Sequence, residues 1–307
     1  MQQIRRKKEI EGTTMPGIIQ NGGQYFFVNL DVYEDGMANC WELVDLKGLK
    51  EKLDIGWLTP SVPVGRTLSI HGLGAYKIQS ANWRFDHETY YENVIHKVKQ
   101  LNPEYENIFT ITKTQKEITE RRKIVHSPTA VDFYVVREMF YETAEGKGLF
   151  IFMKENEKNY LVNMVVYKNG LVGVYHSDFE KYFQFDEVAE LFTSGVFFTE
   201  FTGSLEVIIG ELGEVYFSPV MLAADMKEKQ KELTDMYNRL KGEKTTLEIC
   251  REAYYHYLAN PSDFNRDRLK EKYELVPEHE RMYLGDMDSK DWDYQRIIYS
   301  PNEKREV

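Results

Sequence analysis

The chain has 307 residues, a formal net charge of −11 and 42% hydrophobic residues. This apolar content is typical of a soluble globular protein rather than a disordered one. The acidic balance disfavours binding to a nucleic-acid backbone. Cys40 and Cys250 have no CxxC partners, which excludes a disulfide framework and a cysteine zinc site.

No apolar run reaches the roughly 18 residues that a transmembrane helix needs. The N-terminal segment begins with basic residues but lacks an apolar core of the kind found in secretory signals. We therefore expect no membrane partner and a cytoplasmic location.

The first 105 residues are predicted to contain short strands, a helix and a hairpin. The strand candidates Met15–Gln20, Gln24–Tyr33 and Met37–Leu43 form a meander, whose Asp35-Gly36 turn predicts positive φ at both central residues. Asp45–Leu53 has helical spacing. Two short strands, a glycine-rich hairpin and an amphipathic helix follow, and the expected ranges are Ile55–Thr59, Thr67–Ile70, Ala75–Ile78 and Asp86–Leu101.

Residues 106–147 are predicted to link two copies of one unit. Thr114–Lys123 has the pattern of a polar helix, and the length of the apolar run Ala130–Glu142 slightly favours helix over strand.

The second copy, residues 148–241, repeats the element order of the first. Val28-Asn29 aligns with Val162-Asn163, and at the same offset Gly36 aligns with Gly170 and Trp41 with Tyr175. A constant offset over such a run predicts a duplicated supersecondary unit. We therefore expect an α+β fold with a tandem β-β-β-α-β-β-α unit. Its expected strands and helices are Gly148–Met153, Tyr160–Tyr167, Leu171–Tyr175, Phe185–Phe192, Val196–Phe201, Leu205–Ile209, Glu214–Phe217 and Met221–Leu240.

A helical and acidic extension, residues 242–307, is predicted to follow. Thr245–Asn260 has a capping-box start, with Glu248 three residues after Thr245, and Pro261 ends it. Arg266–Tyr273 forms a second charged helix. The tail then runs through an acidic loop into a strand-like segment, Gln295–Tyr299.

The acidic loop is the clearest candidate for a metal site. Asp286, Asp288 and Asp291 are oxygen ligands of the type that Mg²⁺ or Ca²⁺ prefers. The loop lacks the glycine and glutamate positions of an EF-hand. A solvated turn, in which the aspartates bond their own backbone, is the favoured alternative.

Aromatic residues form two further candidate binding sites. Trp57, His71 and Tyr76 would line a small-molecule pocket between the two copies. Tyr254, Tyr255 and Tyr257 crowd one helix, so at least one of them must lie at a seam or on the surface. Packing between the extension and the repeats is the favoured explanation.

No nucleophile, Walker or Rossmann motif is present. The leading hypothesis is a non-enzymatic module that binds another protein, and its composition is similar to that of bacterial immunity and defence proteins. One alternative is a Mg-dependent phosphodiester hydrolase, in which the aspartates hold the metal and Lys290 orients phosphate. The other is a sensor whose ligand lies between the copies.

Overall fold

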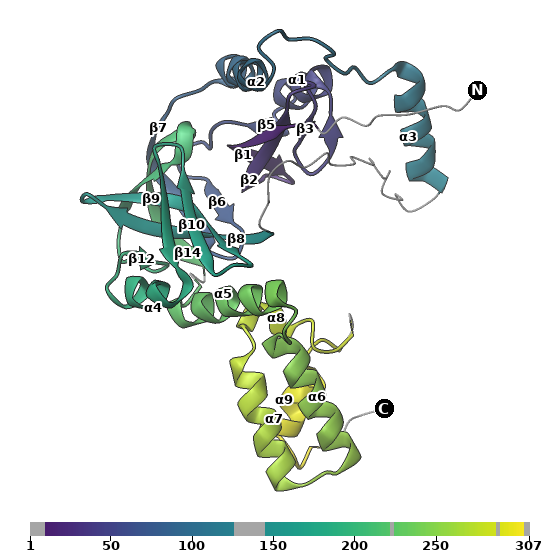
Figure 1. The fold of residues 1–307 in the computed structure, drawn as a ribbon, viewed down its shortest axis with the longest axis vertical. Helices are drawn as coiled ribbons and strands as arrows, with labels where there is room; N and C mark the ends of the chain where they lie inside the picture. The colour runs from purple at the N-terminus through teal and green to yellow at the C-terminus, as the bar shows by residue number, and fades with distance from the viewer. Residues whose placement is uncertain (1–9, 126–144, 222–223, 287–288, 304–307) are drawn as a thin grey trace. The chain divides into compact units, whose positions relative to one another are not determined.

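The structure is a computed structural model that describes residues 10–125, 145–221, 224–286 and 289–303. The chain divides into two compact units, drawn in Figure 1. Unit 1 takes the described residues of 1–71, 75–143 and 203–221, and unit 2 takes the described residues of 72–74, 144–202 and 222–307. Each unit mixes strands and helices.

Two long hairpins show the duplication in the backbone itself. Strands β1 (Gly12–Asn21) and β2 (Gln24–Tyr33) pair antiparallel, as do β8 (Gly146–Glu155) and β9 (Lys158–Tyr167). Every rung of the first hairpin recurs 134 residues later, from Gly12 opposite Tyr33 to Gly146 opposite Tyr167. In both hairpins the tyrosine ring lies over the glycine, where a Cβ would come within 2.8 Å of the ring. Sequence and register therefore repeat together.

The rest of each copy follows the same path at a slightly larger offset. Ile19 pairs with Leu58 in the first copy, and Met153 pairs with Phe197 in the second. These equivalent rungs confirm the predicted α+β fold with a tandem unit. The elements that correspond between the first and the second copy are α1 (Leu46–Asp54) and α4 (Phe185–Thr193), β5 (Leu58–Thr59) and β12 (Phe197–Phe198), β6 (Thr67–Ile70) and β13 (Leu205–Ile209), β7 (Gly74–Trp83) and β14 (Gly213–Met221), and α2 (His87–Leu101) and α5 (Met226–Lys241).

The sheet of unit 1 includes β13 and β14, a hairpin that belongs to the second copy. Its strands run in the order β13-β14-β7-β6-β2-β1-β5, and β14 pairs antiparallel with its own counterpart, β7. Ile78 lies opposite Phe217, the equivalent residue of the other copy, near the centre of this pairing. The ring of Phe217 also packs at 5.2 Å from that of Tyr76, and both side chains are fully buried. Strands of the second copy therefore complete the sheet of the first, and the two copies do not form two separate domains.

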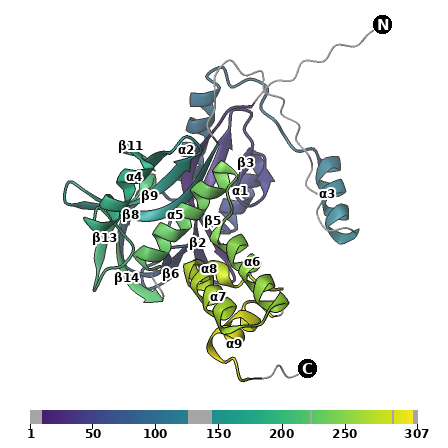
Figure 2. The ribbon, with the colours of Figure 1, turned by 60° about the horizontal axis from the view of Figure 1, so that its bottom comes forward.

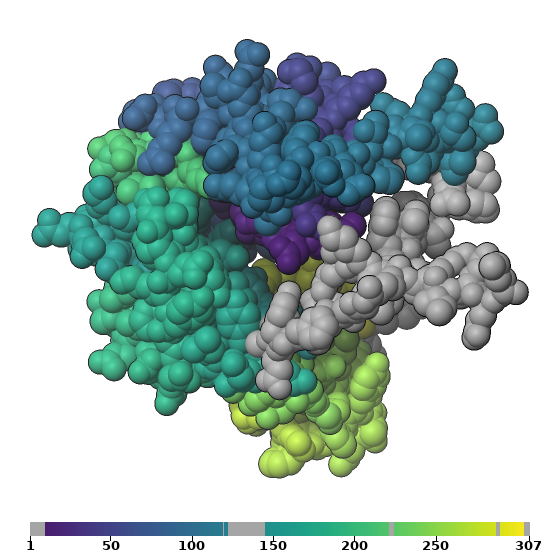
Figure 3. Space-filling model, turned by 45° about the horizontal axis from the view of Figure 1, so that its top comes forward, coloured from purple at the N-terminus to yellow at the C-terminus, as the bar shows by residue number. Residues whose placement is uncertain are grey.

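Helices α1 and α2 cover the sheet of unit 1 through their apolar faces. Leu49, Leu53, Val94 and Val98 are buried, and the fully buried Tyr90 donates a hydrogen bond to the carbonyl of Pro16 at 2.9 Å. Helix α3 (Lys113–Val125) follows, as the polar pattern predicted. In Figure 3 the blue segment from α2 into α3 forms an outer surface of this unit.

Unit 2 joins a small sheet to a helical body. Strands β10 (Leu171–His176) and β11 (Phe179–Gln184) continue from β9, and α5 lies across β8 and β9, as Figure 2 shows. The C-terminal body consists of α6 (Thr246–Ala259), α7 (Asp263–Leu275), α8 (Glu278–Arg281) and α9 (Trp292–Tyr299). Its core is a cluster of buried residues from Cys250 to Ile298.

Some predicted elements differ from the structure. Met37–Leu43 is not one strand, because the chain turns back between β3 (Ala38–Asn39) and β4 (Leu43–Val44). In the Asp35-Gly36 turn, only Gly36 has positive φ, so the prediction of positive φ at both residues was wrong. The Asp35 carboxylate accepts the Met37 N–H, and this bond stabilises the turn with Asp35 at negative φ. The strands predicted at Ile55–Thr59 and Val196–Phe201 shorten to two residues each.

Two further differences lie in unit 2. Strand β11 was missed, because its alternation of half-buried and exposed residues has no fully buried face. The strand-like segment Gln295–Tyr299 is part of α9, because a helix places Tyr294, Ile297 and Ile298 on one side against the C-terminal core. The predicted helix Ala130–Glu142 lies outside the described residues.

Candidate functional site

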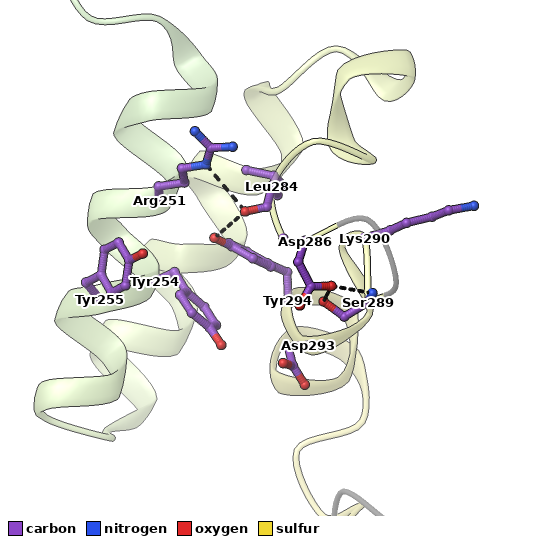
Figure 4. A pocket seen from close by; sticks show the side chains of 10 residues that line it. Arg251, Tyr254, Tyr255, Leu284, Asp286, Ser289, Lys290, Asp293 and Tyr294 are labelled. Carbon is purple, nitrogen blue, oxygen red and sulfur yellow. Dashed lines mark hydrogen bonds between the residues drawn. The ribbon is translucent and has the colours of Figure 1, made fainter. Parts of the chain in front are cut away.

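The C-terminal body contains a pocket of about 390 Å³ between α6 and the turn that precedes α9. Figure 4 shows the first wall, formed by Arg251, Tyr254 and Tyr255 of α6. The opposite wall comes from the turn and the start of α9, and its residues are Leu284, Gly285, Asp286, Ser289, Lys290, Asp293 and Tyr294. The pocket thus unites the predicted tyrosine cluster with the predicted acidic loop.

Helix α6 has a well-defined start that positions its wall of the pocket. The Thr245 hydroxyl accepts the Glu248 N–H, and the Glu248 carboxylate accepts the Thr245 N–H at 2.9 Å, as the capping box predicted. Positions three and four residues apart then share one helical face, which brings Arg251, Tyr254 and Tyr255 together. The cap therefore fixes where α6 begins, and the spacing places these three side chains on one face.

The same helix buries Cys250 beside the pocket. Burial raises the pKa of this thiol to about 12, against the smaller opposing effect of the nearby arginines. The group is therefore a neutral core residue near neutral pH and supplies no nucleophile.

Stacked tyrosines join the two walls of the pocket. The ring of Tyr254 stacks on that of Tyr294 at 4.2 Å, and Tyr294 is itself 6.5 Å from the ring of Tyr273. Burial raises the pKa of Tyr294, so its hydroxyl stays protonated and donates to the carbonyl of Leu284 at 3.4 Å. The pKa of Tyr273 rises to about 12 through burial and through its bond to Asp291. Tyr294 and Tyr273 are therefore uncharged near neutral pH.

Arg251 holds the turn against α6. Its guanidinium donates to the carbonyl of Leu284 at 3.4 Å and to that of Tyr283. At Gly285 a Cβ would lie 1.9 Å from the carbonyl oxygen of Lys290, so any larger residue would clash with the backbone of this turn. Lys290 itself projects away from the pocket in Figure 4.

Asp286 and Asp291, two of the three aspartates of the predicted metal site, have partners within the protein. The Asp286 carboxylate accepts the Ser289 N–H at 2.6 Å and the Ser289 hydroxyl at 2.7 Å. Asp291 accepts the Tyr273 hydroxyl at 2.7 Å and the Gln295 amide at 2.9 Å. Asp288 lies outside the described residues. Within the described ranges, no group of three or more histidine, cysteine or acidic residues could hold a metal ion.

The predicted sensor residues occupy different environments in unit 1. Tyr76 is fully buried against Phe217, whereas His71 is exposed in the turn between β6 and β7. Trp57 is half-buried, with the Lys52 ammonium 4.1 Å from its ring and the ring of Trp41 at 6.3 Å. Ring packing in the core therefore accounts for the position of Tyr76.

The three tyrosines of α6 divide between packing and exposure. Tyr254 and Tyr257 pack against the core of the C-terminal body, whereas Tyr255 is 65% exposed. This confirms that one of them reaches the surface. Tyr254 stacks on Tyr294 of the extension itself, whereas packing between the extension and the repeats was expected.

The sequence did not single out Arg251 or Tyr294 as site residues. The signal for Arg251 was its spacing, three residues before Tyr254 on a capped helix. Tyr294 lies between the acidic loop and Gln295–Tyr299, the segment that was expected to be a strand, and neither prediction included it.

The architecture defines a duplicated α+β protein with an appended helical body that carries the pocket. A family model described as a domain of unknown function (DUF7638) matches residues 1–105 and 134–244, which together make up more than half of the chain. The chain belongs to this family. Residues 245–306, which begin at the cap of α6, match a second model, also described as a domain of unknown function (DUF7639).

Two searches found no further relative: no curated protein and no solved structure matches the chain. Among the described helices, none is both long enough and apolar enough to cross a bilayer.

Proposed function

We propose that this protein is a non-enzymatic binding module and that its C-terminal body holds the partner, a second protein. The observation that carries the proposal is the exposure of large aromatic side chains on this small body. Phe264 and Trp292 are each 75% exposed, Tyr255 is 65% exposed and Tyr283 is 58% exposed. Single exposed apolar residues are ordinary, but aromatic residues gathered on one body are characteristic of protein interfaces.

The pocket supplies the polar part of such an interface. Tyr255 stands at its rim, with Arg251 on the same helix and Asp286 and Asp293 across from it. Binding hot spots are enriched in tyrosine, tryptophan and arginine, and they lie where water is excluded on binding. We infer that a partner side chain enters beside Tyr255 while the surrounding aromatic residues shield it.

Site-specific photo-cross-linking tests this proposal in the full chain within its source cells. A benzophenone amino acid at Tyr255 is expected to yield one dominant adduct with another protein. Tyr182 is the matched control position, because it is also an exposed tyrosine (51%) but lies on β11. Equal adducts from both positions, or no adduct from Tyr255, would contradict the proposal.

The expected cytoplasmic location and the similarity in composition to bacterial defence proteins belong to the same proposal. The hydrolase and sensor alternatives also stay predictions. If Mg²⁺ or Ca²⁺ raises the melting temperature of the wild-type protein but not that of Asp288→Ala, the metal site gains support. A bound small molecule in a native mass spectrum would favour the sensor.

A further inference from the structure

Trp41 in unit 1 has an unusual backbone for so large a residue. Its φ is 69°, in the left-handed region, and its side chain is 63% exposed. A bulky residue seldom adopts this conformation, which costs about 1 kcal/mol. The backbone strain is retained although the indole gains little burial from it, and retained strain often marks a functional position.

Two other aromatic side chains flank Trp41. The ring of Phe26 lies at 6.0 Å, and that of Trp57 lies at 6.3 Å and nearly perpendicular. We call Phe26, Trp41 and Trp57 the tryptophan patch. The far side of Trp57 is occupied, because the Lys52 ammonium lies over its ring and also pairs with Glu42 at 3.1 Å. The accessible side of the patch is therefore the Trp41 side.

In the second copy, the residue equivalent to Phe26 is covered by other side chains. The position of Phe26 corresponds to Tyr160, which is only 9% exposed. Phe179 packs edge-on to Tyr160 at 5.1 Å, and His176 does so at 4.9 Å. Both come from the tip of the β10–β11 hairpin, where their own rings stack on each other at 5.2 Å.

The first copy lacks this tip. Its β3–β4 hairpin has the same base, because Ala38 pairs with Val44 as Val172 pairs with Phe183. Above that base, only residues 40–42 remain in the first copy, compared with residues 174–181 in the second. Within the part of the chain that the structure describes, the shortened hairpin provides no strand that carries a counterpart of Phe179.

We propose that the tryptophan patch binds an extended segment of another protein, and that this segment places an aromatic side chain where Phe179 lies in the second copy. The occupant is inferred from the twin structure, in which a strand presents a phenylalanine to the same hairpin. The patch lies in unit 1 and does not depend on the function proposed for the C-terminal body. The entering ring packs on Phe26, as Phe179 packs on Tyr160, and an offset or edge-on contact with the adjacent Trp41 adds affinity.

A displayed library of random linear peptides, selected on the full-length protein, tests the proposal. We expect enriched peptides to share an aromatic residue and to lose binding to Trp41→Ala by at least about tenfold, as for a hot-spot residue. They should keep their affinity for Tyr182→Ala, an exposed tyrosine outside the patch. Failure to enrich any peptide, or enrichment that Trp41→Ala does not reduce, would overturn the proposal.

A loop graft distinguishes two effects on peptide binding: covering the patch, and removing the Trp41 side chain. Replacing residues 40–42 by residues 174–181 gives the first copy the longer tip while keeping Phe26 and Trp57. This variant should bind none of the selected peptides, and acrylamide should quench Trp57 less in it than in Trp41→Ala. Peptide binding that survives the graft would contradict the proposal. So would a Trp41 that acrylamide fails to quench in the isolated wild-type protein, because the chain itself would then cover the patch.

Discussion

Residue-level differences between the two copies are clearest in the turns of the long hairpins. Gly22 and Gly23 connect β1 to β2 with φ of 57° and 78°, and Asn156 and Glu157 connect β8 to β9 with φ of 48° and 64°. Both are two-residue turns that require positive φ at each position. The first copy meets this requirement with glycine, whereas the second places a glutamate in a strained conformation.

A reciprocal exchange of turn residues should reveal that strain. We expect Glu157→Gly to stabilise the protein by about 0.5 kcal/mol, because the gain in turn energy exceeds the added freedom of the unfolded chain. Gly23→Glu should destabilise by about 1 kcal/mol for the converse reason. Denaturant midpoints of both variants would measure the effect. A destabilised Glu157→Gly would contradict the prediction.

Glu280 shows a second kind of cost at a single residue. Its Oε2 is buried and has no hydrogen-bond partner among the described residues. Burial is the largest cause of a pKa raised above the ordinary 4.5, and Asp235 and Glu232 add to it while His279 and Arg239 oppose it. The folded state therefore holds this proton more tightly than the unfolded state does.

This shift predicts a stability that falls with rising pH. Below pH 4.5 the group is protonated in both states, and the stabilisation is lost as the pH rises from there through the raised folded pKa. Glu280→Gln should remove that slope and stabilise the protein at neutral pH by about 1 kcal/mol. Thermal melts from pH 4 to 8 would measure it. The prediction fails if the variant and the wild type show parallel pH profiles.

At the level of elements, the start of α6 supports the whole C-terminal body. Thr245 is 2% exposed and takes part in both bonds of the capping box. The bond from the Thr245 N–H lowers the pKa of Glu248, so the cap is complete at neutral pH and weakens as the pH falls through that lowered pKa. The next residue, Thr246, donates its N–H to the buried Asp235 of α5 at 3.0 Å.

Removing the cap should loosen α6 and the pocket together. We expect Thr245→Ala to destabilise the protein by about 1 kcal/mol, because the Glu248 N–H loses the Thr245 hydroxyl that accepts it. The exposed Thr234 of α5, whose hydroxyl donates to the Gln230 carbonyl of its own helix, is the control and should tolerate alanine. Hydrogen exchange of the α6 amides would localise the effect. An unchanged exchange rate in α6 would contradict it.

For the whole molecule, the pairing of β7 with β14 has the largest consequence. These strands are counterparts, so the centre of the unit 1 sheet resembles an interface between two identical copies. A chain of residues 1–105 would lack β14 and would leave the edge of β7 and the buried Tyr76 exposed.

Such a shortened chain should therefore associate with itself. We expect residues 1–105 to form a dimer through β7 of each copy, with a mass twice that of the monomer in light scattering. The full-length protein is the reference, because its β7 edge is already paired. A stable, folded monomer of residues 1–105 would contradict this expectation.

Several features could be predicted because they depend on neighbouring residues alone. The constant offset between Val28-Asn29 and Val162-Asn163 revealed the repeat, and alternation gave the strands of both long hairpins. The capping box of α6 was readable because Thr245 and Glu248 satisfy each other within one turn of helix.

Other features depend on contacts between distant segments, which leave no local pattern. The sequence pattern predicts β14 as a strand, but it does not reveal that β14 pairs with β7 as well as with β13 of its own copy. Residues 295–299 have a strand-like composition, and only burial against the core formed with α6 and α7 makes them helical. The pocket required Tyr254 and Asp286, which are 32 positions apart in the chain, to meet, and the tryptophan patch required a shorter hairpin than that of the second copy. Local sequence determined the individual helices and strands of this protein. The burial of side chains from distant segments decided how these elements pair and which side chains stay exposed.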